Sequence, residues 1–488
     1  MQAGVTRQNF KVRHHRANDT EHGVAAERGA DTWHQRRCPS RPHPKHPRRD
    51  DRRDGLTLPR HRENVRRMNA PEPLPDCYEG DPDLLPPDEA MRRIRAHVRA
   101  VRETGTIPVI DALGRVVARD IISPMNVPGH TNSAMDGYAC AGGALPDDAP
   151  RWYAVPGTAY AGKPFPGPVG PSQAVRIMTG AAMPEGTDTV VMQEHVEIDG
   201  DRVRIPPGNR AGQHVRQAGE DLRAGAVVVP RGRRIMPAEM GLLASLGVAG
   251  VDVYRRLRVA YFSTGDEIRP PGTPFAPGLV YDSNRFTMHG MLGRLGVEMV
   301  DLGIVSDRRD AVRSAFIEAA ADADVVLSSG GASTGEADHV KAVLSELGQV
   351  GFWRIAIRPG RPLAFGFVGD SVFFGLPGNP VAVMVTFYQF VAPALRAAAG
   401  EIDFGTILPA VEARCVSRLR KKPGRVEYYR AVLERDDSGA LVVRSTGKSG
   451  SGLLHTMSDA NCFIVLPEHG TTVEPGATVA VQPFFGLM

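Results

Sequence analysis

The chain has 488 residues, of which 42% are hydrophobic, and a formal net charge of +4; these values are typical of a globular protein of several domains. No apolar run reaches 18 residues and the basic N-terminus has no apolar segment, so a membrane span and a secretory signal are both disfavoured. The 5 cysteines are scattered without C-x-x-C spacing, which argues against structural zinc and favours a reducing, cytoplasmic location.

The positive charge is concentrated at the N-terminus. Residues 1–67 contain 17 Lys and Arg but 8 Asp and Glu, whereas residues 68–488 are slightly acidic. Because this leader also lacks apolar periodicity, we predict that residues 1–80 are disordered. They are either a nucleic-acid-binding arm or a translated upstream region before a natural start at Met68; the second interpretation is favoured, and no nucleic acid partner is expected.

Folded structure is predicted from residue 86 onward. Asp88 can cap a helix with an apolar face. The residues on that face are Met91, Ile94, Val98 and Val101. Short β-type runs at 107–110 and 116–122 predict strands, and residues 238–246 predict a short helix closed by Gly247.

Residues 156–171 are typical of a small, strongly turned β lobe, because prolines and glycines alternate with short β-type runs. Residues 132–139 predict a loop with one carboxylate, Asp136, at its tip. A later strand enters a turn at Thr179, and residues 188–194 predict a second strand. This pattern fits either a phosphate contact at Thr179 or an ordinary hairpin.

Residues 257 to about 400 alternate strand-like and helix-like segments. Apolar runs at 257–261, 297–302 and 325–327 are separated by helical patterns, which indicates βαβ units and a parallel sheet. No G-x-G-x-x-G opens a helix here, so a dinucleotide site is not supported.

Two of these strands run into glycine turns followed by acids, at 262–267 and at 327–331, and the second continues to 335–338. The carboxyl ends of parallel strands form the edge of a sheet where ligands bind. Glycine N–H groups and Ser or Thr hydroxyls suit an anion, whereas the acids suit a metal or a proton transfer. Either turn alone is equally compatible with a purely structural role.

The C-terminal third adds basic and rigid segments. Arg354, Arg358 and Arg361 surround a Pro-Gly turn and suit an oxyanion such as phosphate or molybdate, with a solvated basic loop as the alternative. Residues 375–380 predict a rigid loop ahead of an apolar helix. Strand-like runs after residue 408 predict a small β-barrel or sandwich.

Six motifs, each weak alone, occur in the order found in one known family. They are NSAMDGYA at 132–139, MTGA at 178–181, GED at 219–221, STGDE at 263–267, SSGG with GEAD at 328–331 and 335–338, and GLPGNP at 375–380. In these stretches the chain from about residue 80 to 488 resembles the molybdopterin molybdenumtransferases, the MoeA and gephyrin E-domain type.

The resemblance implies a multidomain α/β plus β fold, with elongated N-terminal lobes, a central parallel-sheet α/β domain of the molybdopterin-binding type and a C-terminal small β-barrel. The implied domains are a dimerisation domain from 81–130 and 218–254, a small β lobe at 131–217, the α/β domain at 255–402 and the barrel at 403–488. It also implies a homodimer, with the site between the α/β and barrel domains of one subunit and the N-terminal parts of the other.

The implied reaction is the last step of molybdenum cofactor assembly. Adenylylated molybdopterin and molybdate would give the metallated cofactor and AMP, with Mg²⁺ as the metal. A molybdopterin adenylyltransferase is a candidate partner, and no membrane partner is expected.

The resemblance further implies the site residues. The catalytic set would be Asp136, Thr179, Glu220, Asp221, Glu267, Asp307 and Asp338, with Glu267 and Asp307 on the metal. The substrate-binding set would be Arg216, Ser263, Thr264, Gly265, Ser329, Gly330, Gly331, Arg354, Arg358, Pro377, Pro380, Arg430 and Ser451.

The chain departs from the family pattern in three places. Arginines at 354, 358 and 361 replace lysines of many members, which keeps the charge but removes any deprotonatable amine. Thr131 replaces a common Asp, and Gln217 and Ala218 replace members of an arginine run. Two other functions remain open: a molybdopterin adenylyltransferase, which usually lacks the N-terminal lobes and the barrel, and a non-catalytic scaffold.

Overall fold

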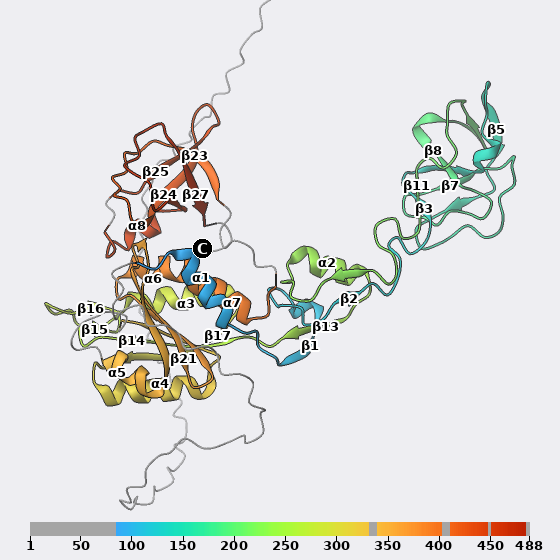
Figure 1. Cartoon of the computed structure of the whole chain (residues 1–488). Helices are drawn as coiled ribbons and strands as arrows, with labels where there is room; N and C mark the ends of the chain where they lie inside the picture. The colour runs from blue at the N-terminus through green and yellow to red at the C-terminus, as the bar shows by residue number, and fades with distance from the viewer. Residues whose placement is uncertain (1–83, 331–338, 403–409, 448–449, 485–488) are drawn as a thin grey trace, which may run out of the picture. The chain divides into compact units, whose positions relative to one another are not determined.

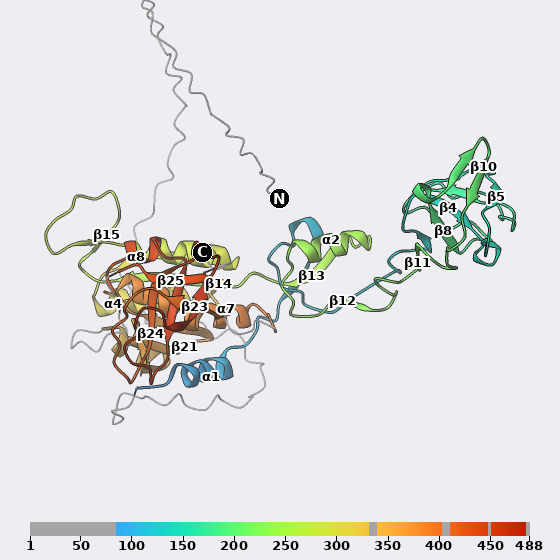
Figure 2. The same cartoon turned by 90° about the horizontal axis from the view of Figure 1, so that it is seen from above.

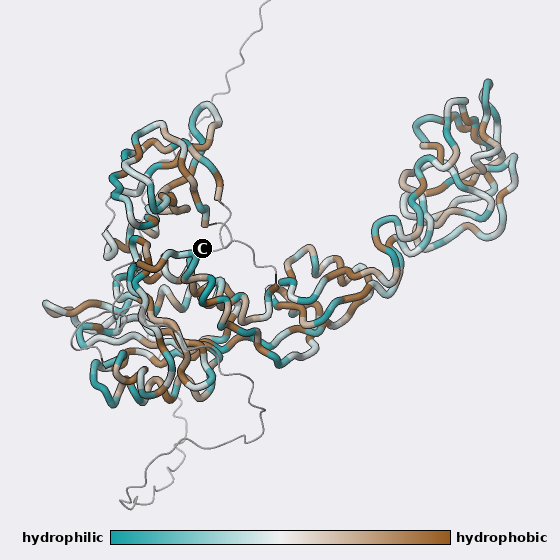
Figure 3. The backbone as a smooth tube through the Cα atoms, viewed as in Figure 1, coloured by the Kyte–Doolittle hydropathy of each residue, from teal (hydrophilic) through white to brown (hydrophobic). Residues whose placement is uncertain are grey.

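The computed structural model describes residues 84–330, 339–402, 410–447 and 450–484. The predicted leader, Gly331 and Asp338 lie outside these ranges. Along the tube of Figure 3, apolar stretches recur in the strands and in the helices beside them. The buried apolar side chains form several separate clusters, and the largest of them packs against one face of the central sheet.

The first helix, α1 (Pro87–His97), differs from its prediction in two ways. Pro86 precedes it without a side-chain cap, and Asp88 lies inside the first turn, where the helix dipole favours a carboxylate. The helix ends at His97 because Val98 adopts an extended conformation, so the predicted face is cut short. Its Ala90 and Ile94 are buried in the core of the α/β region.

Segments far apart in the sequence meet in the N-terminal region. β1 (Thr104–Pro108) pairs with β13 (Gly250–Tyr254), and β2 (Ile121–Ile122) pairs with β12 (Val227–Val229), both antiparallel. Helix α2 (Pro237–Ser245) covers their shared core, and Gly247 follows with a positive φ as predicted. The predicted strand at 116–122 is reduced to β2, preceded by isolated bridges at Val116 and Val117. The turn η1 (Val109–Asp111) follows β1.

The β lobe contains two small sheets. The first has the order β6 (Thr158–Ala159), β7 (Val175–Ile177), β4 (Gly137–Cys140) and β8 (Thr189–Met192), and the second β5 (Arg151–Ala154), β10 (Arg202–Ile205) and β9 (Glu197–Asp199). A further pair joins β3 (Asn132–Ser133) to β11 (Val215–Arg216), and single turns form η2 (Gly142–Ala144) and η3 (Gln193–His195). Because β7 and β8 both pair with β4, which lies between them, the hairpin interpretation is wrong.

The central sheet has six strands and is mixed rather than wholly parallel. Its order is β17 (Glu298–Val305), β14 (Arg258–Thr264), β18 (Val325–Ser329), β22 (Ser371–Leu376), β21 (Pro362–Val368) and β19 (Gly348–Arg354). The first four strands run parallel, and β21 and β19 are antiparallel to their neighbours. A tight turn with Gly369 at a positive φ joins β21 to β22, and so short a connection permits only antiparallel pairing.

Helices cover both faces of this sheet (Figures 1 and 2). Alternate residues of β14 point to opposite faces: Val259 and Tyr261 to one cluster, Ala260 and Phe262 to the other. The first cluster includes α1, α3 (Ser283–Leu295), α6 (Pro380–Thr386), η4 (Phe387–Val391) and α7 (Ala392–Ala398), and the second includes α4 (Arg309–Asp322) and α5 (His339–Leu347). The continuous helix 380–398 is long and apolar enough to cross a membrane but is 89% buried in the protein, so it is a core helix.

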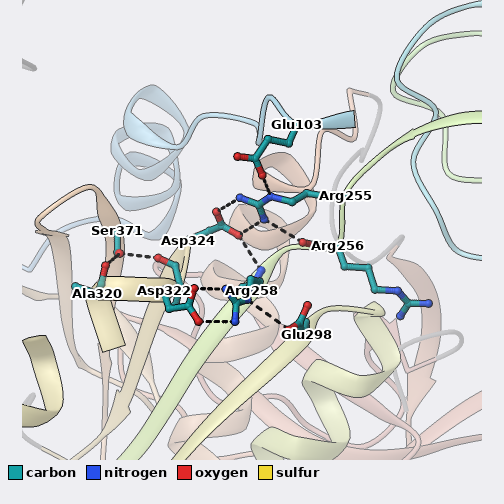
Figure 4. Close-up of polar contacts among 10 residues, drawn as sticks. Glu103, Arg255, Arg256, Arg258, Glu298, Ala320, Asp322, Asp324 and Ser371 are labelled. Carbon is teal, nitrogen blue, oxygen red and sulfur yellow. Dashed lines mark hydrogen bonds and ion pairs between the residues drawn. The ribbon is translucent and has the colours of Figure 1, made fainter. Parts of the chain in front are cut away.

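Ion pairs surround the amino ends of β14 and β18 (Figure 4). Arg255 donates two hydrogen bonds to Asp324, at 2.7 and 2.6 Å, and also contacts Glu103. Asp324 in turn accepts a 2.8 Å bond from the backbone N–H of Arg258, whose guanidinium pairs with Asp322. This network therefore fixes the edge of the sheet opposite the carboxyl ends of its parallel strands.

The C-terminal region forms a closed five-stranded barrel, as predicted. Its strands are β23 (Val411–Cys415), β24 (Val426–Arg435), β25 (Leu441–Ser445), β26 (Cys462–Leu466) and β27 (Thr478–Pro483), and the pairing of β24 with β26 closes it. The short strand β20 (Ile357–Arg358) leaves the α/β region and pairs with β24, and helix α8 (His455–Ser458) precedes β26. The turn at 358–362 is therefore attached to the barrel.

Candidate active site

A cleft of about 1190 Å³ lies at the carboxyl ends of β14, β18 and β22. Its walls are the turns after these strands, the start of α3, the turn at 358–362 and the barrel segment at 450–454. Beside it, two short parallel strands, β15 (Ile268–Arg269) and β16 (Val280–Tyr281), precede α3. The cleft is thus at the edge of the sheet where open α/β folds bind ligands.

Ten of the predicted site residues line this one cleft. They are Thr264, Gly265, Glu267, Asp307, Ser329, Gly330, Arg358, Pro377, Pro380 and Ser451. They come from strand-end turns, the start of a helix and the barrel, so the fold collects side chains that are far apart in the sequence.

Acidic side chains gather on one side of the cleft. Gly265 has a φ of 148°, and a side chain there would lie 2.6 Å from Glu267 Oε2, so the carboxylate folds back over the glycine. The backbone N–H of Asp307 donates to Asp266 Oδ1 at 3.1 Å. Burial raises the pKa of Asp307, and the nearby charges of Asp266 and Glu267 add to that shift, although His339 opposes it. The side is therefore electronegative and would favour a cation.

Within the described ranges, no group of three or more His, Cys, Asp or Glu side chains is arranged to hold a metal ion. Glu267 and Asp307 nevertheless line the same cleft. A metal held there would need its remaining ligands from water or from substrate, which is the ordinary coordination of Mg²⁺ in phosphate-transferring sites.

The hydroxyl groups at the strand ends form a connected network. The Tyr261 hydroxyl lies 2.6 Å from Ser329 Oγ and 3.0 Å from Ser263 Oγ, and Ser263 Oγ donates to Asp282 Oδ1 at 3.0 Å. Burial raises the pKa of Tyr261 above its usual range, so the phenol stays neutral. Ser263 itself does not line the cleft; it anchors Asp282, which does.

The basic side of the cleft depends on the turn at 358–362. Arg358 and Arg361 line the cleft, whereas Arg354 does not. The exposed Arg358 guanidinium lies 3.7 Å from the buried Glu427 carboxylate on β24. Gly360 has a φ of 101°, and a side chain there would lie 2.6 Å from Thr386 Oγ1, so the turn requires glycine.

Arg430 is buried in the barrel and supports the cleft without lining it. Its Nε donates to Thr456 Oγ1 at 3.0 Å and its Nη2 donates to the carbonyl of Gly450 at 3.1 Å. Burial lowers the pKa of Arg430. This guanidinium therefore holds the segment that carries Ser451 to the cleft.

The predicted residues of the N-terminal parts do not line the cleft: Asp136, Thr179 and Arg216 of the β lobe, and Glu220 and Asp221 just after it. Within the lobe, Asp136 Oδ1 accepts two hydrogen bonds from Thr179. Glu220 accepts a 3.0 Å bond from the backbone N–H of Gln217.

Several lining residues were not predicted as site residues, among them Asp282 and Asn284 at the start of α3. The signal was present in the sequence, since polar residues at a helix start follow the short strand β16. The sequence does not show that these two side chains are buried or that they bind Ser263 and Gly378, because these partners lie on turns that are distant in the sequence.

The chain matches three family models in succession. They are "MoeA N-terminal region (domain I and II)" over residues 85–247, "Probable molybdopterin binding domain" over 260–397, and "MoeA C-terminal region (domain IV)" over 412–484.

Similar proteins cover the same ranges. A molybdopterin molybdenumtransferase from Haemophilus influenzae is 42% identical over 409 residues, covering 83% of this chain and 100% of the relative, and one from Nostoc is 33% identical, covering 85% and 97%. A Dictyostelium discoideum gephyrin is 31% identical, covering 81% of this chain and 62% of its own length. A crystal structure of a molybdopterin biosynthesis moeA protein from Pyrococcus horikoshii superposes with a TM-score of 0.71 at 25% identity, covering 82% of this chain and all of that one.

Proposed function

The chain belongs to the molybdopterin molybdenumtransferase family and acts in molybdenum cofactor biosynthesis, and from this premise we propose that it inserts molybdate into adenylylated molybdopterin with release of AMP. The observation that carries the proposal is the single cleft in which acids and arginines converge on the turns after β14, β18 and β22. An adenylylated substrate contains phosphates, and molybdate is a tetrahedral dianion, so both need cationic groups and N–H donors.

Each side of the cleft suits one part of this chemistry. Backbone N–H groups and hydroxyls at Thr264, Ser329 and Gly330 suit the phosphates of the substrate. Arg358 and Arg361 are permanently charged and suit molybdate, which the carboxylates would repel. Water would attack the phosphate bridge and AMP would leave. The two dithiolene thiols would bind molybdenum and displace one oxygen of molybdate, which would leave as water with the two thiol protons.

We propose that Mg²⁺ binds with this substrate. Glu267 and Asp307 would hold it, because their mutual repulsion is part of what raises the pKa of Asp307. When bound, Mg²⁺ would neutralise negative charge on the phosphates. Its preference for oxygen ligands and retained water fits a site with only two carboxylates.

We also propose a homodimer in which a second copy brings the β-lobe residues to the cleft. Supporting this, the N-terminal region exposes large apolar side chains, including Ile110, Leu113, Ile122 and Met236.

A reducing cytoplasm suits the chain, since its described cysteines are free and buried. A molybdopterin adenylyltransferase would supply the substrate.

The test uses purified full-length protein given adenylylated molybdopterin, molybdate and Mg²⁺. We expect stoichiometric AMP release and formation of active cofactor, both abolished by chelating the metal. Glu267→Ala should stop AMP release, and the matched variant Glu318→Ala, an exposed acid on α4 that does not line the cleft, should not. Release of pyrophosphate from ATP and metal-free molybdopterin, with formation of adenylylated molybdopterin, would instead identify an adenylyltransferase.

A further inference from the structure

Two buried acceptor atoms in the cleft wall have no partner within the described part of the chain. Asp282 is 4% exposed and Asn284 is 8% exposed, and both line the cleft. Oδ2 of Asp282 and Oδ1 of Asn284 accept no hydrogen bond. Buried oxygen atoms without donors are unfavourable, so the surroundings of these two are incomplete without a bound donor.

The other polar atoms of both side chains are already engaged. Asp282 caps α3: its Oδ1 accepts from the backbone N–H of Arg285 at 3.1 Å and from Ser263 Oγ at 3.0 Å. Asn284 Nδ2 donates to the carbonyl of Gly378 at 2.8 Å. Each side chain is therefore held through one of its two polar atoms, and the atom left without a partner in each is an oxygen acceptor.

On the basis of the function proposed above, we infer that Asp282 and Asn284 form a subsite that binds a pair of hydrogen-bond donors on the organic part of the substrate. A carboxylate oxygen and an amide oxygen repel oxyanions and accept hydrogen bonds from N–H or O–H groups. The subsite is thus complementary to the arginine side of the same cleft.

The substrate has two groups with this chemistry. The pterin ring has an amino group next to a ring N–H, so one edge presents two donors. The ribose of the adenylyl group presents two adjacent hydroxyls. Both would satisfy the same acceptors, and separate probes distinguish them.

The experiment measures dissociation constants of full-length protein for three probes: 6-hydroxymethylpterin by fluorescence quenching, and AMP and molybdate by calorimetry. Asp282→Asn retains an acceptor for the α3 cap but places an N–H₂ group where the free acceptor was. We expect it to weaken either pterin or AMP binding about tenfold or more, whichever group occupies the subsite. Molybdate should bind unchanged or more tightly.

Two further variants separate the subsite from a structural effect. Asn284→Ala should weaken the same probe as Asp282→Asn, and Asp310→Asn, the same change in the first turn of α4 and outside the cleft, should weaken none. If Asp282→Asn does not fold, Asp282→Ser offers another cap without the free acceptor. Unchanged pterin and AMP affinity in these variants, or no binding of either probe by the parent protein, would overturn the inference. Failure of AMP release by the parent protein would instead overturn the proposed function.

Discussion

Thr179 donates two hydrogen bonds to one oxygen of Asp136: its backbone N–H and its hydroxyl each lie 2.7 Å from Oδ1. The backbone bond is the main cause of a lowered Asp136 pKa, and the hydroxyl adds to it. Thr179 thus keeps the carboxylate ionised and fixes its direction at the tip of the loop before β4.

Replacing this hydroxyl should change the titration of Asp136. Thr179→Val keeps the backbone hydrogen bond to Asp136 but removes the bond from the hydroxyl. Because the hydroxyl bond stabilises only the ionised carboxylate, the pKa of Asp136 should rise towards its ordinary value of 3.8. Carbon-13 NMR of labelled aspartate carboxyls would follow it, with Thr179→Ser as the control that retains the hydroxyl. Equal shifts in both variants would show that the hydroxyl bond contributes nothing.

Removing one acid from the cleft should alter the dependence on magnesium. Glu267→Gln keeps the size of the side chain but removes its charge, so we expect the magnesium concentration for half-maximal AMP release to rise about 10-fold or more. Molybdate affinity should hold steady, since Glu267→Gln leaves Arg358 and Arg361 of the same cleft unchanged. If Glu267→Gln lowers the rate of AMP release but leaves the half-maximal magnesium concentration at the parent value, Glu267 does not belong to the metal site.

A methyl group at Gly330 should distort the turn after β18. The residue has a φ of 90°, and an added Cβ would lie 2.6 Å from both the carbonyl oxygen and Oγ1 of Thr264. Gly330→Ala should therefore separate the ends of β14 and β18 and weaken substrate binding, at a cost of about 1–3 kcal/mol in stability. Gly378→Ala, with open space around its Cβ position, is the matched control. Similar melting temperatures and KM values for both variants would argue against this close approach.

The parts of the fold that depend on local pattern were predictable. Apolar runs at β14 and β18 are long enough and branched enough to indicate buried strands, and glycine turns with acids mark their carboxyl ends. The family resemblance then indicated ten residues that do line the cleft.

What could not be predicted depends on neighbours distant in the sequence. No strand was predicted at β21 or β19, because the segment around the Pro-Gly turn was interpreted only as a basic loop, and the sheet was therefore predicted to be parallel. Arginine is a residue type that often binds anions, yet the guanidinium of Arg430 donates its hydrogen bonds to Gly450 and Thr456 inside the barrel. The position of Asp282 before a helix is typical of a capping residue. Only the folded structure shows that its second oxygen, Oδ2, is buried and accepts no hydrogen bond.

Glu401 offers a prediction about stability and pH. Its side chain is 5% exposed and receives hydrogen bonds from Arg396 at 2.9 and 2.7 Å and from Arg234 at 3.1 Å. Arg396 belongs to α7 and Arg234 precedes α2, so the carboxylate connects the N-terminal region to the α/β region. Burial alone would raise the pKa of Glu401, but the bonds and charges of the two arginines outweigh it, and the pKa is lowered from 4.5.

Glu401→Gln should therefore be destabilising at neutral pH, by about 2 kcal/mol or more, because it leaves two partly buried arginines without their carboxylate. A lowered pKa means that the contribution of the carboxylate is complete above the ordinary value of 4.5 and is lost as the pH falls through the folded value. The melting temperatures of parent and variant should thus differ most at neutral pH and converge in acid. Glu412→Gln, on an exposed residue of β23, should follow the parent at every pH. A gap between parent and Glu401→Gln that stays constant down to the acid limit would show that the stabilisation comes from packing and not from charge.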